Sequence, residues 1–292
     1  MRLLLLGANG QVGWELQRSL APLGEVIVPA QRADFTQPEA LAALVGALKP
    51  DVIANAAAYT AVDKAESDAE AARAINATAA AVLAREAATL GAWLLHYSTD
   101  YVFDGSGSAA RSEDAPTGPV NVYGRTKLEG EQLIRASGCR HLILRTSWVY
   151  GTRGGNFAKT MLRLARERER LTVIDDQVGA PTGAELLADL TVHALRTAQQ
   201  RREVAGTYHA VASGHTSWHG YASHVVAFAR QAGQNLKVAP DAIEPVPTSA
   251  FPTPARRPTN SRMDTTKLRA TFGVTLPDWR AGVDRMLNEV LT

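Results

Sequence analysis

A buried strand that runs directly into a glycine loop constrains the fold of this chain most. Residues 2–6 are an apolar run, and Gly7, Gly10 and Gly13 follow it at intervals of three. A helix is predicted over residues 14–20. Glycine allows a tight turn with close backbone approach, and the free N–H groups of a helix N-terminus attract a pyrophosphate. Three spaced glycines alone are about as often an ordinary turn, but the flanking strand and helix favour nucleotide binding.

The first half of the chain alternates short apolar runs with longer helical segments. Such alternation is typical of a parallel sheet wound with helices. Helices are expected to begin near Gln11, Pro38, Glu66 and Val122, and the Ala-rich stretch 69–88 is predicted to be a packed helix. Strands are predicted at Arg2 to Leu6, Glu25 to Pro29, Asp51 to Asn55, Ala92 to Ser98 and His141 to Ser147.

The second half is less regular. Helices are predicted over 157–168, 184–198 and 221–232, while five prolines between 245 and 258 predict a loop. We therefore expect an α/β fold with a Rossmann-like, doubly wound parallel sheet and a smaller C-terminal α/β region. The dinucleotide-binding domain is expected over 1–150, with later segments returning to it, and a discontinuous substrate-binding region over 151–292.

Composition excludes several classes of protein. The 292 residues are 46% hydrophobic, enough for a large core, and the net charge of +2 provides no basic surplus for nucleic acid. The N-terminal apolar run is too short for a signal peptide or a membrane span. The single cysteine, Cys139, permits no intrachain disulfide and fits a reducing compartment. We therefore expect a cytoplasmic protein with neither nucleic-acid nor membrane partners.

A second motif places a tyrosine and a lysine on one helix face. Tyr123 and Lys127 are four residues apart, so they share a face. A nearby ammonium is expected to lower the pKa of the tyrosine from about 10 toward the range of a proton donor. A lone Y-x-x-x-K would more often be a surface pair, but here an upstream strand ends in Thr99, Asp100 and Tyr101. Because ligands of open α/β sheets bind beyond the carboxyl ends of the strands, this cluster favours a catalytic site.

These motifs resemble the dTDP-4-dehydrorhamnose reductases, within the extended short-chain dehydrogenase/reductase family. The matching segments cover nearly the whole chain and include G-x-x-G-Q-V-G-W-E-L, H-Y-S-T-D-Y-V-F, N-V-Y-G-x-T-K, R-T-S-W-V-Y and D-Q-x-G-A-P-T-G-A-E-L. The resemblance implies NADPH-dependent reduction of the C4 keto group of dTDP-4-dehydro-β-L-rhamnose to dTDP-L-rhamnose. This is the last step in making a precursor of bacterial cell-surface polysaccharide such as the lipopolysaccharide O-antigen.

The resemblance also assigns residues. It implies Tyr123 as proton donor, Lys127 as its partner and Thr99 as the third catalytic residue. Together with the residues already argued from the glycine loop and from Arg32, the full set of expected cofactor contacts is Gly7, Gly10, Gln11, Val12, Gly13, Arg32, Asp34, Phe35, Ala58, Tyr59, Thr60, Tyr123 and Lys127. The expected substrate contacts are Thr99, Asp100, Tyr101 and Trp148, with Val62 as a weaker candidate. Arg257, Arg262 and Asn156 are candidates to hold the diphosphate, since arginine binds phosphate bidentately.

Metal binding and association are less well determined by the sequence. The resemblance associates Mg²⁺ with a dimer contact, where Glu15 and Glu185 match the glutamates concerned, so a homodimer with a non-catalytic Mg²⁺ is an expectation from the family only. His215, His219 and His224 have spacings that a zinc site could use. No cysteine accompanies them, and we interpret them as ordinary helix and loop residues.

Two rival interpretations remain open. One is a nucleotide-sugar epimerase or dehydratase on the same scaffold, but Asp100-Tyr101 lacks the Asp-Glu pair that such dehydratases place there. The other is a non-enzymatic protein resembling the regulatory subunit of methionine adenosyltransferase. The intact Thr99, Tyr123 and Lys127 favour catalysis over that binding role.

The end of the second strand predicts the cofactor preference. No acid follows Val28 to hold a ribose 2′-hydroxyl, while Arg32 can meet a 2′-phosphate. We expect NADPH to be preferred over NADH, and Arg32→Ala to reduce the preference. The measurement is kcat/KM with each cofactor for both proteins, and equal efficiency with both cofactors in the parent would contradict the prediction.

Overall fold

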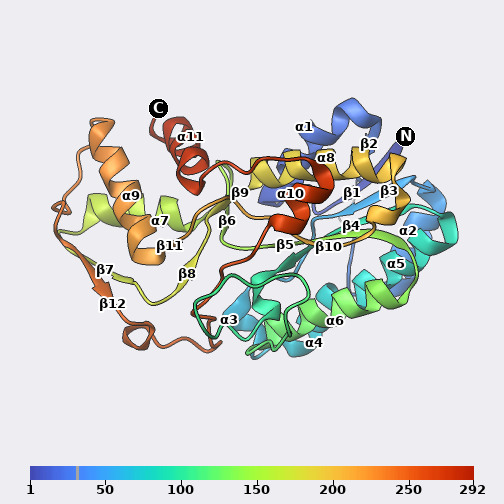
Figure 1. Ribbon diagram of the computed structural model, residues 1–292, viewed down its shortest axis with the longest axis horizontal. Helices are drawn as coiled ribbons and strands as arrows, with labels where there is room; N and C mark the ends of the chain where they lie inside the picture. The colour runs from blue at the N-terminus through green and yellow to red at the C-terminus, as the bar shows by residue number, and fades with distance from the viewer. Residues whose placement is uncertain (31–32) are drawn as a thin grey trace.

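A parallel six-stranded sheet forms the centre of the larger lobe (Figure 1). The computed structural model describes residues 1–30 and 33–292. The strands of this sheet are β1 (Arg2–Leu6), β2 (Glu25–Ile27), β3 (Val52–Asn55), β4 (Trp93–Thr99), β5 (Arg140–Thr146) and β10 (Gly206–His209). Their order is β10-β5-β4-β3-β1-β2, and all neighbours are parallel. The order reverses between β1 and β3, which is where doubly wound sheets bind ligands.

Successive leucines of β1 serve opposite faces of this sheet. Leu3 and Leu5 pack in a core with α1 (Gln11–Leu20) and α8 (Ala184–Gln200). Leu4 and Leu6 pack in a core on the other face with α2 (Pro38–Leu48) and α5 (Ala79–Leu90). Because helices cover both faces, the strand is apolar throughout rather than alternating. Figure 1 shows α1, α8 and α10 above the sheet and α5 and α6 below it. The helices on the sheet are α1 (Gln11–Leu20), α2 (Pro38–Leu48), α5 (Ala79–Leu90), α6 (Val122–Ala136), α8 (Ala184–Gln200) and α10 (Thr266–Phe272). The predicted doubly wound α/β fold is confirmed.

The second half of the chain builds a smaller lobe with its own core, at the left of Figure 1. Its buried residues include Leu162, Val173, Tyr221 and Trp279. They come from α7 (Phe157–Glu167), α9 (Trp218–Gln231), α11 (Trp279–Leu291) and β7 (Leu171–Ile174). Three two-stranded sheets pair β7 with β12 (Ile243–Val246), β8 (Val178–Gly179) with β11 (Thr216–Ser217), and β6 (Val149–Tyr150) with β9 (Thr182–Gly183). Between these segments, α8 and β10 return to the large sheet.

The structure corrects two details of the predicted elements. The helix expected to begin near Glu66 is divided, because α3 (Val62–Ala65) ends before it and α4 (Ala69–Arg73) begins after it. The Ala-rich helix then continues through the π-helical segment η2 (Ala74–Thr78) into α5. Pro245 was predicted to lie in a loop but lies in β12. A two-stranded sheet leaves one side of β12 unpaired, so the missing N–H of a proline is tolerated there. Within the described residues, the 3₁₀ segments are η1 (Ala21–Leu23), η3 (Asp100–Val102), η4 (Arg202–Val204) and η5 (Thr248–Ala250).

Helix α6 lies against η2 at a point where only glycine fits. A Cβ placed on Gly130 would lie 2.2 Å from the carbonyl oxygen of Asn76. We expect Gly130→Ala to lower the free energy of unfolding by about 1–3 kcal/mol, because one backbone must move away from the other. Gly46→Ala in α2 is the control: its Cβ would meet nothing within 4 Å, so it should stabilise by about 0.5–1 kcal/mol. Urea denaturation of both variants measures the difference, and equal effects would contradict the packing argument.

Candidate active site

The predicted catalytic residues come together at the carboxyl edge of the sheet. Thr99 is the last residue of β4, while Tyr123 and Lys127 lie on the first two turns of α6. Thr99 and Lys127 are almost fully buried, at 5% and 2% exposure. The rings of Tyr101 and Tyr123 meet edge to face, with their centroids 5.5 Å apart. A half-buried tyrosine therefore lies together with a buried lysine and a buried threonine at this edge of the sheet.

Local interactions place the start of α6. The side chain of Asn121 caps the helix, because its Oδ1 accepts a hydrogen bond of 2.8 Å from the N–H of Gly124. The N–H of Val122 donates to Glu66 Oε1 at 2.7 Å. A Cβ on Gly124 would lie 2.2 Å from the carbonyl oxygen of Tyr101, so this glycine lets the helix touch η3. Tyr123 is therefore held beside the end of β4.

A buried ion pair holds the middle of the same helix. Arg145 on β5 binds Glu131 on α6 through two hydrogen bonds, Nε to Oε1 at 2.8 Å and Nη2 to Oε2 at 2.7 Å. Both side chains are essentially inaccessible, at 3% and 0% exposure. Although burial alone raises the pKa of a carboxyl group, Arg145 holds the pKa of Glu131 below its usual value. Arg145 also donates to the carbonyl oxygen of Glu113.

Burial dominates the acidity of Tyr123. It raises the pKa of the phenol to about 12, the negative charge of Asp100 adds to the rise, and interaction with the Thr99 hydroxyl opposes it. The expectation that a nearby ammonium lowers this pKa is therefore wrong for this structure. The reason is that Lys127 Nζ is turned to other partners, while desolvation penalises the phenolate. At neutral pH, Tyr123 carries its proton.

Lys127 is held between a carbonyl group and a histidine. Its Nζ donates to the carbonyl oxygen of Tyr97 at 2.6 Å and lies 3.3 Å from Nε2 of His96. Burial lowers the pKa of Lys127 to about 8, while the charge of Glu131 opposes the fall. The lysine can therefore change its charge within about one pH unit of neutrality.

Asp100 is a second buried acid at this edge. Its Oδ1 accepts a hydrogen bond of 3.0 Å from the Thr99 hydroxyl. Its Oδ2 is buried and has no hydrogen-bond partner within the described residues. Burial raises the pKa of Asp100 to about 6, and the hydroxyls of Ser261 and Thr99 oppose the rise. An unpartnered carboxylate oxygen in such a place can accept a hydrogen bond from a ligand hydroxyl.

The glycine loop follows β1 at the reversal of strand order. Gly7 has a φ of +79°, and a Cβ on it would lie 2.5 Å from the backbone nitrogen of Ala57. A Cβ on Gly13 would lie 2.1 Å from the Gly7 carbonyl oxygen. Gly10 caps α1, and a Cβ placed on it would meet nothing closer than 3.4 Å, so the loop leaves space beside Gly10. Gln11 adds a buried Oε1 without a partner in the part of the chain described, and Val12 follows it on α1. These features fit a dinucleotide pyrophosphate.

The segment after β3 is held by Asn76, a residue that the sequence motifs did not single out. Asn76 Oδ1 accepts from the N–H of Tyr59 at 2.9 Å, and its Nδ2 donates to the Tyr59 carbonyl at 3.2 Å and to Thr126 Oγ1 at 3.1 Å. One buried amide thus ties η2, α6 and the segment containing Ala58, Tyr59 and Thr60. The π-helical turn at η2 is the local irregularity that marks its position.

The residues after β2 are only partly described. Arg32 lies outside the described residues. Asp34 is exposed and accepts hydrogen bonds from Thr36 through both its N–H and its hydroxyl, and these bonds lower the pKa of Asp34. Phe35 is buried in the core beneath α2 and α5. The adenine contact predicted for Asp34 and Phe35 stays a prediction.

Trp148 borders both lobes. It has a φ of +50°, which is unusual for a bulky side chain, and its ring stacks on Trp218 with centroids 3.6 Å apart. A Cβ on Gly179 would lie 2.8 Å from the Trp148 ring and 3.1 Å from the Cβ of Ser261. Trp148 therefore lies near Ser261, whose hydroxyl is close to Asp100. One face of the Trp148 ring is covered by Trp218. The sequence did not indicate Trp218.

The candidate diphosphate residues have different surroundings. Arg257 Nη2 binds Asp63 Oδ2 at 2.6 Å, and its Nη1 is buried without a partner among the described residues. Asn156 caps α7 through Lys159 and donates to the Gly151 carbonyl, so its amide is engaged locally. Arg262 binds Asn260 Oδ1 at 3.1 Å. Among these three residues, Arg257 alone combines a buried free donor with a place beside Tyr101. Burial raises the pKa of Tyr101, and the charge of Arg257 opposes the rise.

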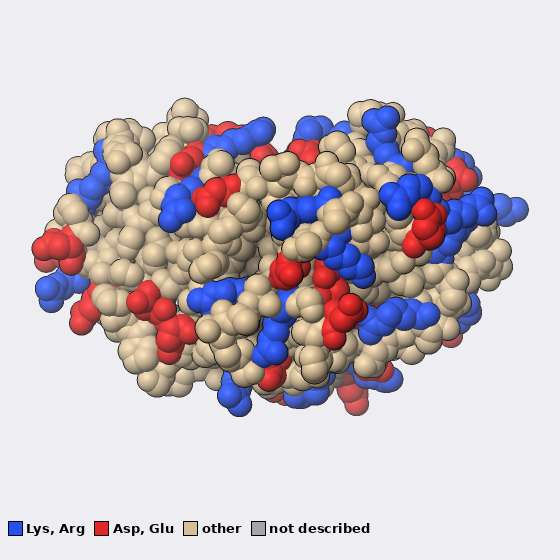
Figure 2. Space-filling view, in the orientation of Figure 1, with Lys and Arg blue, Asp and Glu red and all other residues tan. Residues whose placement is uncertain are grey.

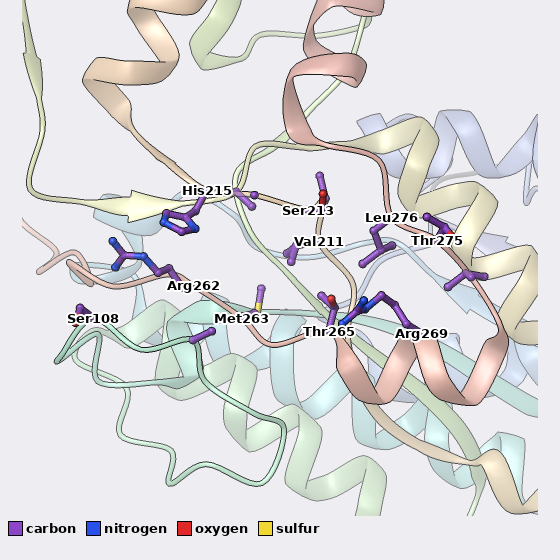
Figure 3. Close-up of a pocket in the computed structure, with 15 residues that line it drawn as sticks. Ser108, Val211, Ser213, His215, Arg262, Met263, Thr265, Arg269, Thr275 and Leu276 are labelled. Carbon is purple, nitrogen blue, oxygen red and sulfur yellow. The ribbon is translucent and has the colours of Figure 1, made fainter.

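A cavity of about 690 Å³ adjoins this edge of the sheet (Figure 3). Its walls come from the segment after β10, the segment that leads into α10, and α10 itself. Figure 3 shows His215 and Arg262 on one side, Val211 and Met263 in the middle, and Arg269 on the other side. Thr99, Tyr123 and Lys127 do not line this cavity. This cavity, which runs along Arg262, Met263 and Thr265, therefore does not contain the catalytic cluster.

The residues considered for a metal do not form a metal site. Glu15 and Glu185 each contact an arginine, Arg18 at 3.6 Å and Arg285 at 3.3 Å. No group of three or more His, Cys, Asp or Glu suited to a metal ion occurs within residues 1–30 and 33–292. Two arginine-paired glutamates do not fit Mg²⁺, which prefers several oxygen ligands. The Mg²⁺ prediction therefore has no support in this chain. Of the three histidines, His219 binds the Ile243 carbonyl and His224 binds Asp284.

The surface has mixed charge. Figure 2 shows Lys and Arg interspersed with Asp and Glu over the visible face, in keeping with the net charge of +2. No helix in the described part of the chain has both the length and the apolarity that crossing a membrane requires.

The whole chain, residues 1–292, matches the protein family described as RmlD substrate binding domain. It is 56% identical to a dTDP-4-dehydrorhamnose reductase of Escherichia coli, over all of this chain and 99% of that protein. The chain belongs to this family. Among solved RmlD-family structures, a dTDP-4-dehydrorhamnose reductase of Clostridium acetobutylicum superposes with a TM-score of 0.91 at 36% identity over the full length of both chains. That of Bacillus anthracis, in complex with NADP, superposes with a TM-score of 0.87 at 34% identity over 99% of both chains. The resemblance seen in the motifs is confirmed.

The buried charge of Asp100 generates a test. Its pKa in the folded protein, about 6, lies above the usual 3.8. The folded state therefore binds this proton more tightly, and stability is lost as the pH rises from about 4 to above 6. We expect Asp100→Asn to gain up to about 3 kcal/mol in free energy of unfolding, relative to the parent, between pH 4 and pH 7.5. Urea denaturation at both pH values measures it, and a difference that does not change with pH would contradict the buried charge.

Proposed function

We propose that this RmlD-family chain reduces the C4 keto group of dTDP-4-dehydro-β-L-rhamnose with NADPH, giving dTDP-L-rhamnose. The observation that carries the proposal is a cluster of buried Thr99 and Lys127 with half-buried Tyr123 at the carboxyl edge of a dinucleotide-binding sheet. Full-length identity of 56% to a protein named for this reaction supports the choice of substrate. The NADP complex of the Bacillus anthracis relative supports a nicotinamide cofactor. NADPH over NADH remains a proposal that rests on the missing acid after Val28.

Tyr123 is the proton donor of this proposal. Reduction of a ketone develops negative charge on its oxygen, which must receive a proton. The pKa of a tyrosine is about 10 in water, and burial and Asp100 raise that of Tyr123 further, so Tyr123 holds the required proton at neutral pH. Thr99 lies beside Tyr123, and its hydroxyl, which donates to Asp100 Oδ1 in this structure, would turn to donate a hydrogen bond to the same oxygen. The site is therefore set for reduction, whereas oxidation of an alcohol by this tyrosine would need its phenolate.

Lys127 and the glycine loop serve the cofactor in this proposal. NADPH, when bound, would supply the hydride that converts the ketone to an alcohol. The Gly7 to Gly13 loop, with Gln11 and Val12, would hold the pyrophosphate at the N-terminus of α1. Ala58, Tyr59 and Thr60 would form the wall beside it, and Lys127 would hold the ribose.

Substrate contacts follow from the free groups near the cluster. Asp100 Oδ2 is an acceptor for a sugar hydroxyl, and the free Nη1 of Arg257 is a donor for the diphosphate. Trp148, whose ring is stacked on Trp218, would pack against the sugar. In this arrangement residues 1–150, with α8 and β10, bind the cofactor, and the smaller lobe binds the sugar nucleotide. A cytoplasmic location and a homodimer remain expectations from the family resemblance.

The rival activities are less well supported. A dehydratase would need a second acid and base at the sugar, and Tyr101 follows Asp100 where such enzymes place a glutamate. A regulatory binding protein would not require a half-buried tyrosine beside a buried lysine and threonine. Burial raises the pKa of Tyr123 and lowers that of Lys127, and burying such groups costs stability. Groups with strongly shifted pKa values are concentrated at functional sites.

Tyr123→Phe tests the proposal. It keeps the ring against Tyr101 but removes the proton donor, and general-acid catalysis contributes about 10²–10⁴-fold, so turnover should fall by that factor. NADPH binding should change little, because the glycine loop is untouched. Single-turnover NADPH oxidation with dTDP-4-dehydrorhamnose and cofactor titration by fluorescence measure the two quantities on one preparation.

Tyr208→Phe is the matched control, since it removes another buried hydroxyl of the same sheet, bonded to the Val204 carbonyl at 2.7 Å. It should retain parental turnover. Full activity in Tyr123→Phe would remove Tyr123 from the mechanism. A parent that binds NADPH but oxidises it with no keto sugar would favour the regulatory role.

A further inference from the structure

His96 is a buried histidine that the proposed reaction does not use directly. It lies in the middle of β4 at 1% exposure, with Asn55 of β3 beside it. Its Nδ1 is 3.1 Å from Asn55 Nδ2, and its Nε2 is 3.3 Å from Lys127 Nζ. Both ring nitrogens are therefore in contact with polar groups, one of which belongs to the proposed catalytic cluster.

The orientation of Asn55 decides which ring nitrogen carries the proton. Asn55 Oδ1 accepts a hydrogen bond of 3.2 Å from the N–H of Ala57. A backbone N–H is only a donor, so the oxygen of this amide must face Ala57 and its NH₂ must face His96. The NH₂ donates to Nδ1, which must then be the unprotonated nitrogen. In the neutral ring the proton is on Nε2, directed at Lys127.

The charge state of the ring follows from its surroundings. Burial and the nearby Lys127 hold the pKa of His96 well below its usual value, with a further contribution from His141 on β5. The ring is therefore neutral at physiological pH. An Nε2–H group that faces Lys127 Nζ can form a hydrogen bond only if Nζ accepts, which requires the neutral amine.

We propose that His96 is a positioning residue: held by Asn55 with its proton on Nε2, it presents a hydrogen-bond donor to Lys127 Nζ and so favours the neutral amine of Lys127. Burial of Lys127 acts in the same sense, and the nearest carboxylate acts in the opposite one. Glu131, one turn along α6, favours the ammonium, but Arg145 of β5 shares its charge. On β3 the neighbouring side chain is the uncharged Asn55, and η2 (Ala74–Thr78) has no ionisable side chain.

The consequence for turnover rests on the proposed function. After Tyr123 has given its proton away, the phenolate must be reprotonated before the next reduction. A lysine that gains and loses a proton near neutral pH can pass one to the phenolate and take another from solvent. By favouring the neutral amine, His96 sets the pH above which this supply of protons fails.

The first measurement needs no substrate. Long-range ¹H–¹⁵N correlation of the histidine rings identifies the protonated nitrogen of His96, whose signals are assigned by their loss in His96→Gln. We expect the Nε2-protonated ring in the parent protein. A ring protonated on Nδ1 would overturn the proposal.

The second measurement titrates Lys127 in protein labelled with ¹³C-lysine. In His96→Gln the side-chain amide can turn its oxygen toward Nζ, so the titration midpoint of Lys127 should rise by about one pH unit. Asn55→Asp keeps an acceptor for Ala57 but draws the ring proton to Nδ1, leaving Nε2 as an acceptor for the ammonium, so its midpoint should also rise. His141→Gln, the control, removes a nearby imidazole bonded to the Cys139 carbonyl and should leave the midpoint within about 0.2 pH units.

An unchanged or lowered midpoint in a folded His96→Gln protein would overturn the proposal. If that variant does not fold, the parent ring and Asn55→Asp decide the matter. In the pH profile of kcat, the alkaline limb should shift to higher pH together with the Lys127 midpoint. The substrate KM should change little. If no keto sugar is turned over, the proposed function fails, while the two NMR measurements still decide the role of His96.

Discussion

The buried pair of Arg145 and Glu131 ties helix α6 to strand β5, and the position of the candidate active site depends on it. The two side chains meet through paired hydrogen bonds with almost no exposure to water. Removing one partner of such a pair leaves an uncompensated buried charge, which costs about 3–5 kcal/mol. Because Tyr123 and Lys127 lie on the same helix, this pair sets their height above the sheet. The cap at Asn121 and the close contact at Gly124 fix the N-terminal end of α6.

Desolvation then determines the chemistry of the groups so placed. The same dry environment raises the pKa of Tyr123 and Asp100 and lowers that of Lys127. A phenol that keeps its proton and a lysine that exchanges one near neutrality are suited to protonating a ketone oxygen. The charge of Asp100 strengthens the first effect, and the Nε2–H of His96 strengthens the second. Solvent exclusion and a few oriented dipoles therefore give these common residues their proposed roles.

Close backbone approach is the other condition of this site. Gly7 and Gly13 allow the loop after β1 to touch Ala57 and itself, and Gly130 allows α6 to touch η2. These contacts bring the ends of β1, β3 and β4 to one edge of the sheet. The glycine loop and the catalytic cluster thereby lie at the same edge, although more than a hundred residues separate the loop from Tyr123 and Lys127 along the chain.

Much of the fold was predictable from local pattern. The apolar runs predicted five strands of the large sheet, and the glycine spacing predicted the loop. The Y-x-x-x-K pair predicted that Tyr123 and Lys127 share one helix face. Each of these features depends on residues that are close together in the chain. The break at Glu66 and the strand at Pro245 were missed, since they depend on what packs beside them. The tertiary structure alone decided that His96, Asn76 and Trp218 adjoin the site, and that burial raises the pKa of Tyr123. Desolvation and hydrogen-bond geometry arise between segments distant in sequence, so no local pattern encodes them.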